Sequence, residues 1–517
     1  MRTSSLPRYR HQWYVNQDPV LLADELGRTI QARCSEYYST TGRNYQDIIM
    51  IGHSMGAVLM RKAFVFARGQ NHELRRASLI PATLPWASNV SRMILFAGMN
   101  RGWSFHPRPK NMPRWKNWPA RMLVRAMTLL NLGTLLRSLS RGAPFISNLR
   151  IQWINLVRQD QPIPLVIQLL GNEDDVVHAE DNIDLQTGRD FVYKQAPAGT
   201  NHSNVVDLKD PDRRRLFLEA LLRPSEHLDS DYIVPDGQKA DTSIDSVIFV
   251  MHGIRDFGDW TRRFSEAVQA YARNLGRKVL PVRPGYGYFP MLKFLLFSER
   301  QINVRWFMDQ YTEVLAKYPR AEIDFVGHSN GTYLLASGLS RYKACSFNRA
   351  VFAGSVVPRD YPWDQMVHDG RIRSIRNYVA SADIIVGVFP RLFEQFGGDV
   401  GSSGLLGFTR EPAVQSEWHY VAGGHGAAIN GRNFGSIADY LISGNASSPP
   451  DDICVDDYNQ LALLIAKLYW VVWLILLGIL INAAWLLSFA SAPPLSLHAW
   501  LHLALFILFV FAILCTI

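Results

Sequence analysis

The most constraining feature of this sequence is a pentapeptide that occurs twice, each time between an apolar run and a helical run. The first copy is GHSMG at residues 52–56, and the second is GHSNG at residues 327–331. Glycines two places before and after the serine remove side chains that would collide where a strand turns sharply into a helix. We therefore predict a strand–turn–helix unit in each half of the chain, with the serine hydroxyl exposed at the top of a sheet.

The surrounding pattern predicts the fold class. Each pentapeptide is followed by a second apolar strand, MILFAGMNRGW at 93–103 and RAVFAGSVVPRDYPW at 349–363. Alternating strands and helices indicate an α/β fold with a parallel sheet and helices on both of its faces. Apolar residues make up 48% of the 517 residues and charged residues 19%, which excludes a disordered chain.

Polar stretches divide the chain. We predict a first domain at 1–224, a linker at 225–244, a second domain at 245–444 and a second linker at 445–458. The remaining residues, 459–517, contain two uncharged runs, at 468–490 and 497–517. Each run could cross a hydrocarbon layer of about 30 Å, so we predict a transmembrane hairpin; the alternative is a helical hairpin buried in a core.

With its strand and helix in place, each half resembles the lipase and esterase members of the α/β-hydrolase superfamily. The resemblance implies two tandem domains of that fold and a catalytic triad in the chain order Ser, Asp, His. In the first half, Ser54 would be the nucleophile. Asp174 follows the apolar strand PLVIQLL and fits the acid position, and His202 precedes the last helix of this half.

In the second half the same order is Ser329, Asp383 and His425. The resemblance gives the imidazole the role of general base and the carboxylate the role of fixing its tautomer. His53 and His328, inside the two pentapeptides, are interpreted as supporting residues.

The two halves differ in the segment that would complete an oxyanion hole. The second half begins with a strand that leads into His252-Gly253, and Ile254 and Asn330 are the expected amide donors. In the first half Met55 is the expected donor, but no strand of this kind precedes the nucleophile. Either upstream residues are missing, another segment contributes the second donor, or the first half is a weakened enzyme. The second half is therefore the stronger candidate for activity.

Two further segments leave alternatives open. The region of about 101–150 holds nine basic residues up to Arg141 and no acidic one, a local excess that matches the net charge of +9. It is interpreted as an amphipathic lid on anionic lipid or, equally, as a soluble cap over the active site. The run GYGYFPMLKFLLF at 285–297 lines an acyl pocket or belongs to a buried helix.

These observations lead to one leading hypothesis: a membrane-anchored serine hydrolase that cleaves a carboxylic ester, of hydrophobic or lipid character, through an acyl-enzyme. No metal, cofactor or nucleic-acid partner is expected. Because the N-terminus has basic residues without an apolar run behind them, no secretory signal is predicted, and the domains are expected on the cytoplasmic side of a membrane. The rival hypothesis is a membrane-tethered regulatory or interaction module built from weakened hydrolase domains.

Overall fold

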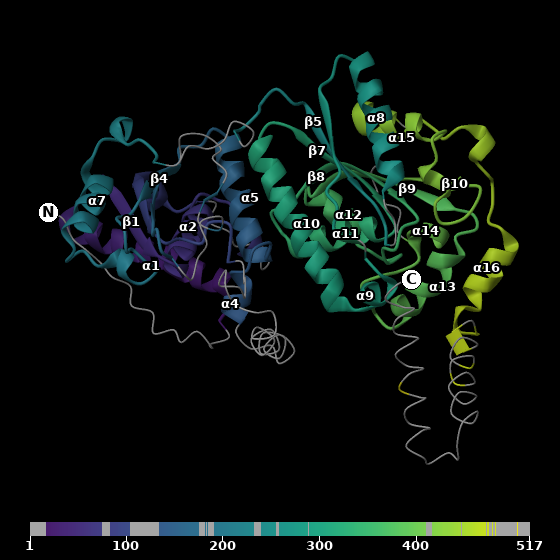
Figure 1. Ribbon diagram of the computed structural model, residues 1–517, viewed down its shortest axis with the longest axis horizontal. Coiled ribbons are helices and arrows are strands. Elements are labelled where there is room, and N and C mark those ends of the chain that lie inside the picture. Colours follow the sequence, from purple (N-terminus) through teal and green to yellow (C-terminus); the bar gives the residue numbers. More distant parts are fainter. Residues whose placement is uncertain are drawn as a thin grey trace, which may run out of the picture. The chain divides into compact units, whose positions relative to one another are not determined.

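The protein forms two compact units (Figure 1). The computed structural model describes residues 17–74, 83–103, 134–174, 181, 183–184, 191–231, 239–254, 258–287, 289–409, 416–445, 447–471, 473–474, 478, 481 and 504. The first unit comprises Met1–Asp241 with two short segments, Met308–Pro319 and Tyr342–Ala344, and the second comprises the rest of the chain.

The first unit is built on a parallel sheet in the order β1-β2-β3-β4. Its strands are β1 (Ile48–His53), β2 (Val90–Phe96), β3 (Leu165–Leu170) and β4 (Phe191–Gln195). Its helices are α1 (Pro19–Thr41), α2 (Met55–Ala67), α4 (Thr134–Ser138), α5 (Pro144–Arg158) and α7 (Pro211–Leu222), with short 3-10 turns at His72–Leu74, Pro85–Asn89, Asn204–Val206 and Ser225–His227.

Helices cover both faces of this sheet, as the alternation of apolar runs predicts. Successive strand residues point to opposite faces. Met93 and Leu95 of β2 pack in one apolar cluster with α2 and α5, whereas Ile94 and Phe96 pack in another against α7, where Phe96 meets Phe217. Residues 144–150 of the predicted lid lie in α5 and are mostly buried, and residues 104–133 lie outside the described residues.

The second unit has a larger parallel sheet in the order β10-β9-β8-β7-β5-β6. Its strands are β5 (Ser246–Met251), β6 (Val279–Val282), β7 (Glu322–His328), β8 (Phe347–Ala353), β9 (Ile372–Ala380) and β10 (Ser416–Val421). Its helices are α8 (Asp259–Asn274), α9 (Met291–Leu295), α10 (Phe297–Lys317, grouped with the first unit from Met308 on), α11 (Asn330–Arg341), α12 (Trp363–His368), α13 (Ile384–Gln395), α14 (Ser403–Leu406), α15 (Phe434–Ser443) and α16 (Gln460–Lys467), with 3-10 turns at Ala427–Ile429 and Asp451–Ile453.

The two faces of this sheet are also covered. Ile248 and Val250 of β5 pack in a cluster with α8 and α15, and Phe249 between them meets Phe307 of α10 edge-on at 5.5 Å. All six residues of β5 are buried, as expected of a strand inside a parallel sheet. The α/β fold class with parallel sheets is therefore confirmed. Two tandem copies of the α/β-hydrolase fold remain a prediction.

The predicted transmembrane hairpin is corrected by the structure. Within the described residues no helix has both the length and the apolar character to cross a bilayer, although most of 468–490 and 497–517 lies outside those residues. The helix α16 ends at Lys467, and aromatic residues just after it contact α13. The indole of Trp473 donates to the carbonyl of Val388 at 3.3 Å, and the guanidinium of Arg391 lies 5.4 Å from the ring of Tyr469. The prediction used only the length of the uncharged run and did not anticipate that Tyr469 and Trp473 contact α13.

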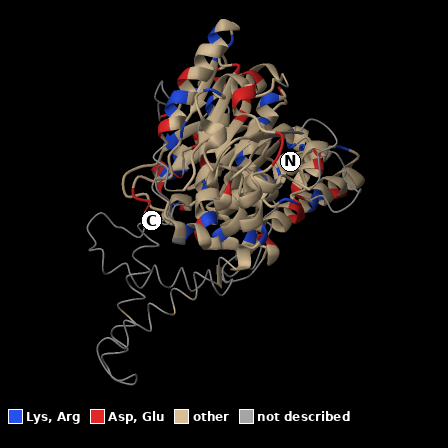
Figure 2. Ribbon diagram, turned by 90° about the vertical axis from the view of Figure 1, so that its right-hand side faces the viewer, with Lys and Arg blue, Asp and Glu red and all other residues tan. Residues whose placement is uncertain are grey.

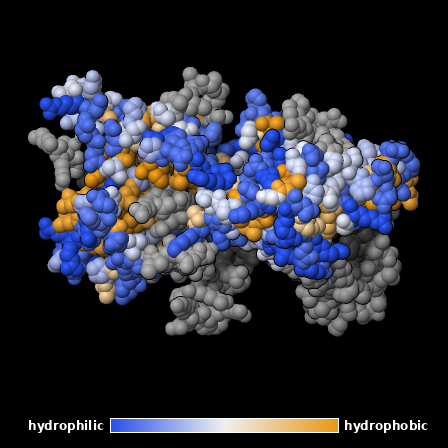
Figure 3. Space-filling model, turned by 90° about the horizontal axis from the view of Figure 1, so that it is seen from above, coloured by the Kyte–Doolittle hydropathy of each residue, from blue (hydrophilic) through white to orange (hydrophobic). Residues whose placement is uncertain are grey.

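Charged and apolar residues are mixed along the described part of the chain. In Figure 2 the basic residues are interspersed with acidic ones. Figure 3 shows apolar residues in small patches between hydrophilic ones on the face that it presents.

Candidate active site

Both serines occupy a sharp turn between a strand and a helix. Ser54 lies between β1 and α2 with φ 53° and ψ −123°, and Ser329 lies between β7 and α11 with φ 53°. A positive φ is costly for a residue with a side chain and is typical of a nucleophile held in a strained elbow. Each elbow is anchored in the same way. The amide of Ser54 donates to the carbonyl of Phe96 at 2.9 Å, and that of Ser329 to the carbonyl of Ala353 at 3.0 Å.

In the first unit the three predicted side chains form one hydrogen-bonded chain. His202 Nε2 lies 3.0 Å from Ser54 Oγ, and His202 Nδ1 lies 3.1 Å from Asp174 Oδ2. The side chain of Asp174 is only 3% exposed. A carboxylate accepts from a protonated Nδ1, which leaves Nε2 free to accept the serine proton. The arrangement is therefore able to transfer a proton from the hydroxyl.

In the second unit the acid and the histidine are joined, and the serine is not hydrogen-bonded to them. His425 Nδ1 lies 2.9 Å from Asp383 Oδ2, and the carboxylate is fully buried. The other oxygen of Asp383 accepts from the amide of Val386 at 3.1 Å, which caps α13 and fixes the carboxylate. Among the described residues no hydrogen bond links Ser329 Oγ to the His425 imidazole. Such bonds often form only when substrate is bound.

The two elbow histidines have matching partners that the sequence did not reveal. His53 Nε2 donates to the carbonyl of His202 at 2.9 Å, and His328 Nε2 donates to the carbonyl of His425 at 3.1 Å. Burial lowers the pKa of the His53 imidazole, and the bond to the carbonyl opposes this shift. Each elbow thus ties down the loop that carries its own partner histidine. The shared GHS sequence was the signal for this, but the acceptor could be found only in three dimensions.

The second unit places its predicted oxyanion segment against the nucleophile. A Cβ added at Gly253 would lie 2.8 Å from the Cβ of Ser329, so the backbone at this position passes directly beside the elbow. Ile254 follows immediately, and Asn330 is the first residue of α11. Backbone amides at a helix N-terminus and in such a loop are suited to stabilising an oxyanion.

The corresponding edge of the first unit is open in the part of the chain that the structure describes. There β1 pairs with β2 alone, whereas its counterpart β7 lies between β8 and β5. The surroundings of the second glycine in each pentapeptide show this difference between the two strand edges. A Cβ at Gly331 would lie 2.7 Å from the carbonyl oxygen of Met251 in β5, whereas a Cβ at Gly56 would meet nothing among the described residues within 4 Å. Met55 is the first residue of α2, as predicted. On the side of β1 away from β2, no strand is described that could supply a second oxyanion donor.

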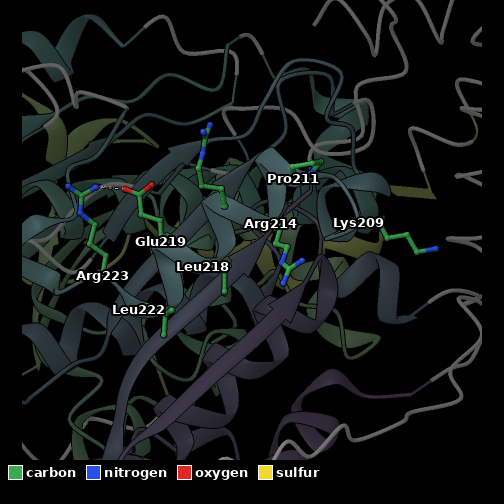
Figure 4. A pocket seen from close by; sticks show the side chains of 8 residues that line it. Lys209, Pro211, Arg214, Leu218, Glu219, Leu222 and Arg223 are labelled. Carbon is green, nitrogen blue, oxygen red and sulfur yellow. Dashed lines mark hydrogen bonds and ion pairs between the residues drawn. The ribbon is translucent and has the colours of Figure 1, made fainter.

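The described part of the first unit includes two hollows. One, of about 470 Å³, runs between α1, β1 and α2 and reaches the elbow at Gly52, His53 and Gly56. The other, of about 650 Å³, lies along α7, and Figure 4 shows Arg214, Leu218 and Leu222 on that helix beside it. It contains no residue of the triad, so of these two hollows it is the first that adjoins the candidate site.

Comparisons with known proteins leave the family open. No family model matches the sequence, and no curated protein matches it. Solved structures that are similar in part include an uncharacterised protein from Bacillus cereus (13% identity, TM-score 0.29, 47% of this chain and 74% of that chain). They also include the esterase Est2 from Thermogutta terrifontis (15%, 0.24, 41% and 85%) and Est1E from Butyrivibrio proteoclasticus (10%, 0.24, 39% and 87%). Likenesses this weak assign neither a family nor a function.

Proposed function

We propose that this protein is a serine hydrolase that cleaves carboxylic esters through an acyl-enzyme. The observation that carries the proposal is the hydrogen-bonded chain from Ser54 through His202 to Asp174 on a strained elbow. The matching pair of Asp383 and His425 beside Ser329 supports the same chemistry in the second unit. Amide and thioester cleavage use the same groups, and substrate comparison separates them.

The reaction follows from these groups. The hydroxyl oxygen of the serine attacks the carbonyl carbon of the ester while its proton passes to the neutral imidazole Nε2. The tetrahedral oxyanion receives hydrogen bonds from backbone amides, in the second unit those of Ile254 and Asn330. Collapse of this intermediate breaks the bond to the alcohol oxygen, which takes the proton from Nε2. Water then attacks the acyl-serine by the same steps, and the carboxylic acid leaves.

The two sites are unequal in complementary ways. The first unit has the assembled proton pathway but, among the described residues, an open strand edge beside the serine. The second has the loop of Gly253 against its serine. Since losing one oxyanion donor typically costs about 100- to 1,000-fold in rate, we assign the main activity to Ser329. The expectation of a lipid substrate depended on the transmembrane hairpin and loses that basis.

The test is covalent labelling with a fluorophosphonate probe, together with hydrolysis of p-nitrophenyl esters from acetate to palmitate. Wild type is compared with Ser54→Ala, Ser329→Ala and the double variant. Each single variant should keep one labelled serine, the double variant should lose all labelling, and Ser329→Ala should lose most of the turnover. The ester series shows which acyl chain length is preferred.

A second candidate is a regulatory or interaction module without turnover, which the open edge of β1 favours. Folded wild-type protein that neither labels nor hydrolyses any ester of the series supports the module and contradicts the hydrolase. Thermal unfolding of each variant establishes that the compared chains are folded.

A further inference from the structure

The hydroxyl of Tyr286 meets three polar groups next to the Ser329 elbow. Its single proton is shared between the carbonyl oxygens of His252 at 2.7 Å and Gly253 at 2.9 Å, and its oxygen accepts from Asn330 Nδ2 at 3.3 Å. His252 and Gly253 form the loop that leads to Ile254, and Asn330 follows the nucleophile. One hydroxyl therefore joins both backbone segments that would supply the oxyanion amides.

The direction of these bonds matters because of peptide geometry. In a trans peptide the carbonyl of one residue and the amide of the next point in opposite directions. A group that holds the carbonyls of His252 and Gly253 on one side therefore turns the amides of Gly253 and Ile254 to the other side. The loop is in contact with the nucleophile, since a Cβ on Gly253 would lie 3.3 Å from Ser329 Oγ. Amides set in advance in this way need no reorganisation when negative charge develops.

The ring of Tyr286 is itself fixed. It stacks on the imidazole of His252 at 4.5 Å with an angle of 23° between the planes, and it meets Phe289 and Trp306 edge-on at 6.0 and 5.7 Å. His252 adds a bond from Nδ1 to the carbonyl of Gly253 at 2.9 Å. The hydroxyl thus has a defined position that a freely rotating phenol would not have.

We propose that Tyr286 is a positioning residue of the Ser329 site, whose hydroxyl aligns the loop of Gly253 and Ile254 with the first turn of α11. This role rests on the proposed function of that site. The side chain of Asn330 is fully buried, and its Oδ1 has no hydrogen-bond partner among the described residues. The side chain's one described hydrogen bond is from Nδ2 to the hydroxyl of Tyr286, and this bond connects the elbow to the loop.

The experiment uses the full chain with Ser54→Ala, so that turnover reports Ser329 alone. Tyr286→Phe keeps the ring contacts and removes only the hydroxyl. We expect kcat for p-nitrophenyl butyrate to fall about 10- to 100-fold, a fraction of the loss for a missing donor, with KM changed less than about 3-fold. The inhibition constant of a trifluoromethyl ketone, which forms a tetrahedral oxyanion on the serine, should rise by the same factor as kcat/KM falls.

Two further variants make the result specific. Tyr271→Phe removes a hydroxyl bonded to Asp439 at 2.6 Å on the same unit and should change neither constant. Asn330→Ala keeps its backbone amide and should lower kcat less than Tyr286→Phe, and the double variant should be no worse than Tyr286→Phe alone, because both act through one network.

The outcomes separate the two proposals. A Tyr286→Phe protein with kcat and inhibitor affinity within about twofold of its parent overturns the positioning role, even if it unfolds at a lower temperature, and so does a change confined to KM. If the Ser54→Ala chain hydrolyses esters no faster than the Ser54→Ala/Ser329→Ala chain, the proposed function of this site fails, and the role of Tyr286 fails with it.

Discussion

His328 Nε2 donates a hydrogen bond of 3.1 Å to the carbonyl oxygen of His425. The residue before the nucleophile thus holds the loop that carries the proposed base, across 97 residues of sequence. We predict that His328→Phe, which removes the donor and keeps an aromatic ring, lowers kcat/KM at the Ser329 site about 10-fold, the equivalent of one hydrogen bond of about 1.4 kcal/mol. Ester kinetics in the Ser54→Ala chain measure this, and His53→Phe in the same chain is the control. Equal loss in both variants would show a general effect on folding.

Asp383→Asn should abolish most of the activity of the second unit without unfolding it. The amide oxygen can still accept from Val386 and cap α13, but an amide nitrogen facing His425 Nδ1 favours the tautomer with the proton on Nε2. That imidazole is unable to accept the serine proton, and a loss of about 1,000- to 10,000-fold in kcat is expected. The measurement is kcat in the Ser54→Ala chain beside thermal unfolding. Retention of more than a tenth of kcat would argue against the assigned role.

Gly331→Ala and Gly56→Ala form a matched pair that tests the difference between the two strand edges. The first places a Cβ 2.7 Å from the carbonyl of Met251, so a strand must shift, and overpacking of this kind costs about 1–3 kcal/mol. The second meets no described atom within 4 Å and should be neutral or slightly stabilising in a helix. Chemical unfolding followed by tryptophan fluorescence compares them. A destabilisation by Gly56→Ala as large as that by Gly331→Ala would contradict an open edge at β1.

Asp324 should make the stability of the second unit depend on pH. Burial raises the pKa of this carboxyl from 3.8 to about 6, while bonds from Ser246 and the amide of Arg349 oppose the shift. Because the folded state keeps the proton that the unfolded state has lost, the contribution is full below about pH 4 and is lost as the pH rises through 6, by about 3 kcal/mol in total.

Asp324→Asn provides the control for this titration. The neutral amide still accepts from the Arg349 amide and keeps nearly the same shape, so the variant should lose less stability than wild type between pH 4 and pH 7.5. Urea unfolding at several pH values gives both free energies of unfolding. Parallel curves for the two proteins would mean that Asp324 titrates normally.

Local patterns predicted which residues the fold brings together better than they predicted the C-terminal segment. The pentapeptides, with their flanking apolar and helical runs, predicted both elbows, and the strand before Asp174 predicted the acid that His202 contacts. The bonds of His328 and Tyr286 could not be predicted, because they join segments 97 and 33–44 residues apart whose approach depends on the packing of the sheet. The hairpin failed for the opposite reason. The length of an uncharged run is a property of that segment alone. It does not take into account the carbonyl of Val388 in α13, which accepts a hydrogen bond from Trp473.

The contrast between Gly331 and Gly56 has a consequence for related sequences. At position 331 any larger side chain would collide with the carbonyl oxygen of Met251, so we expect related sequences to keep glycine there. Position 56 is under no such restriction from the described residues, and alanine or serine is free to accumulate. If related sequences nevertheless keep glycine at 56, a further polypeptide segment that packs against the edge of β1 would explain it.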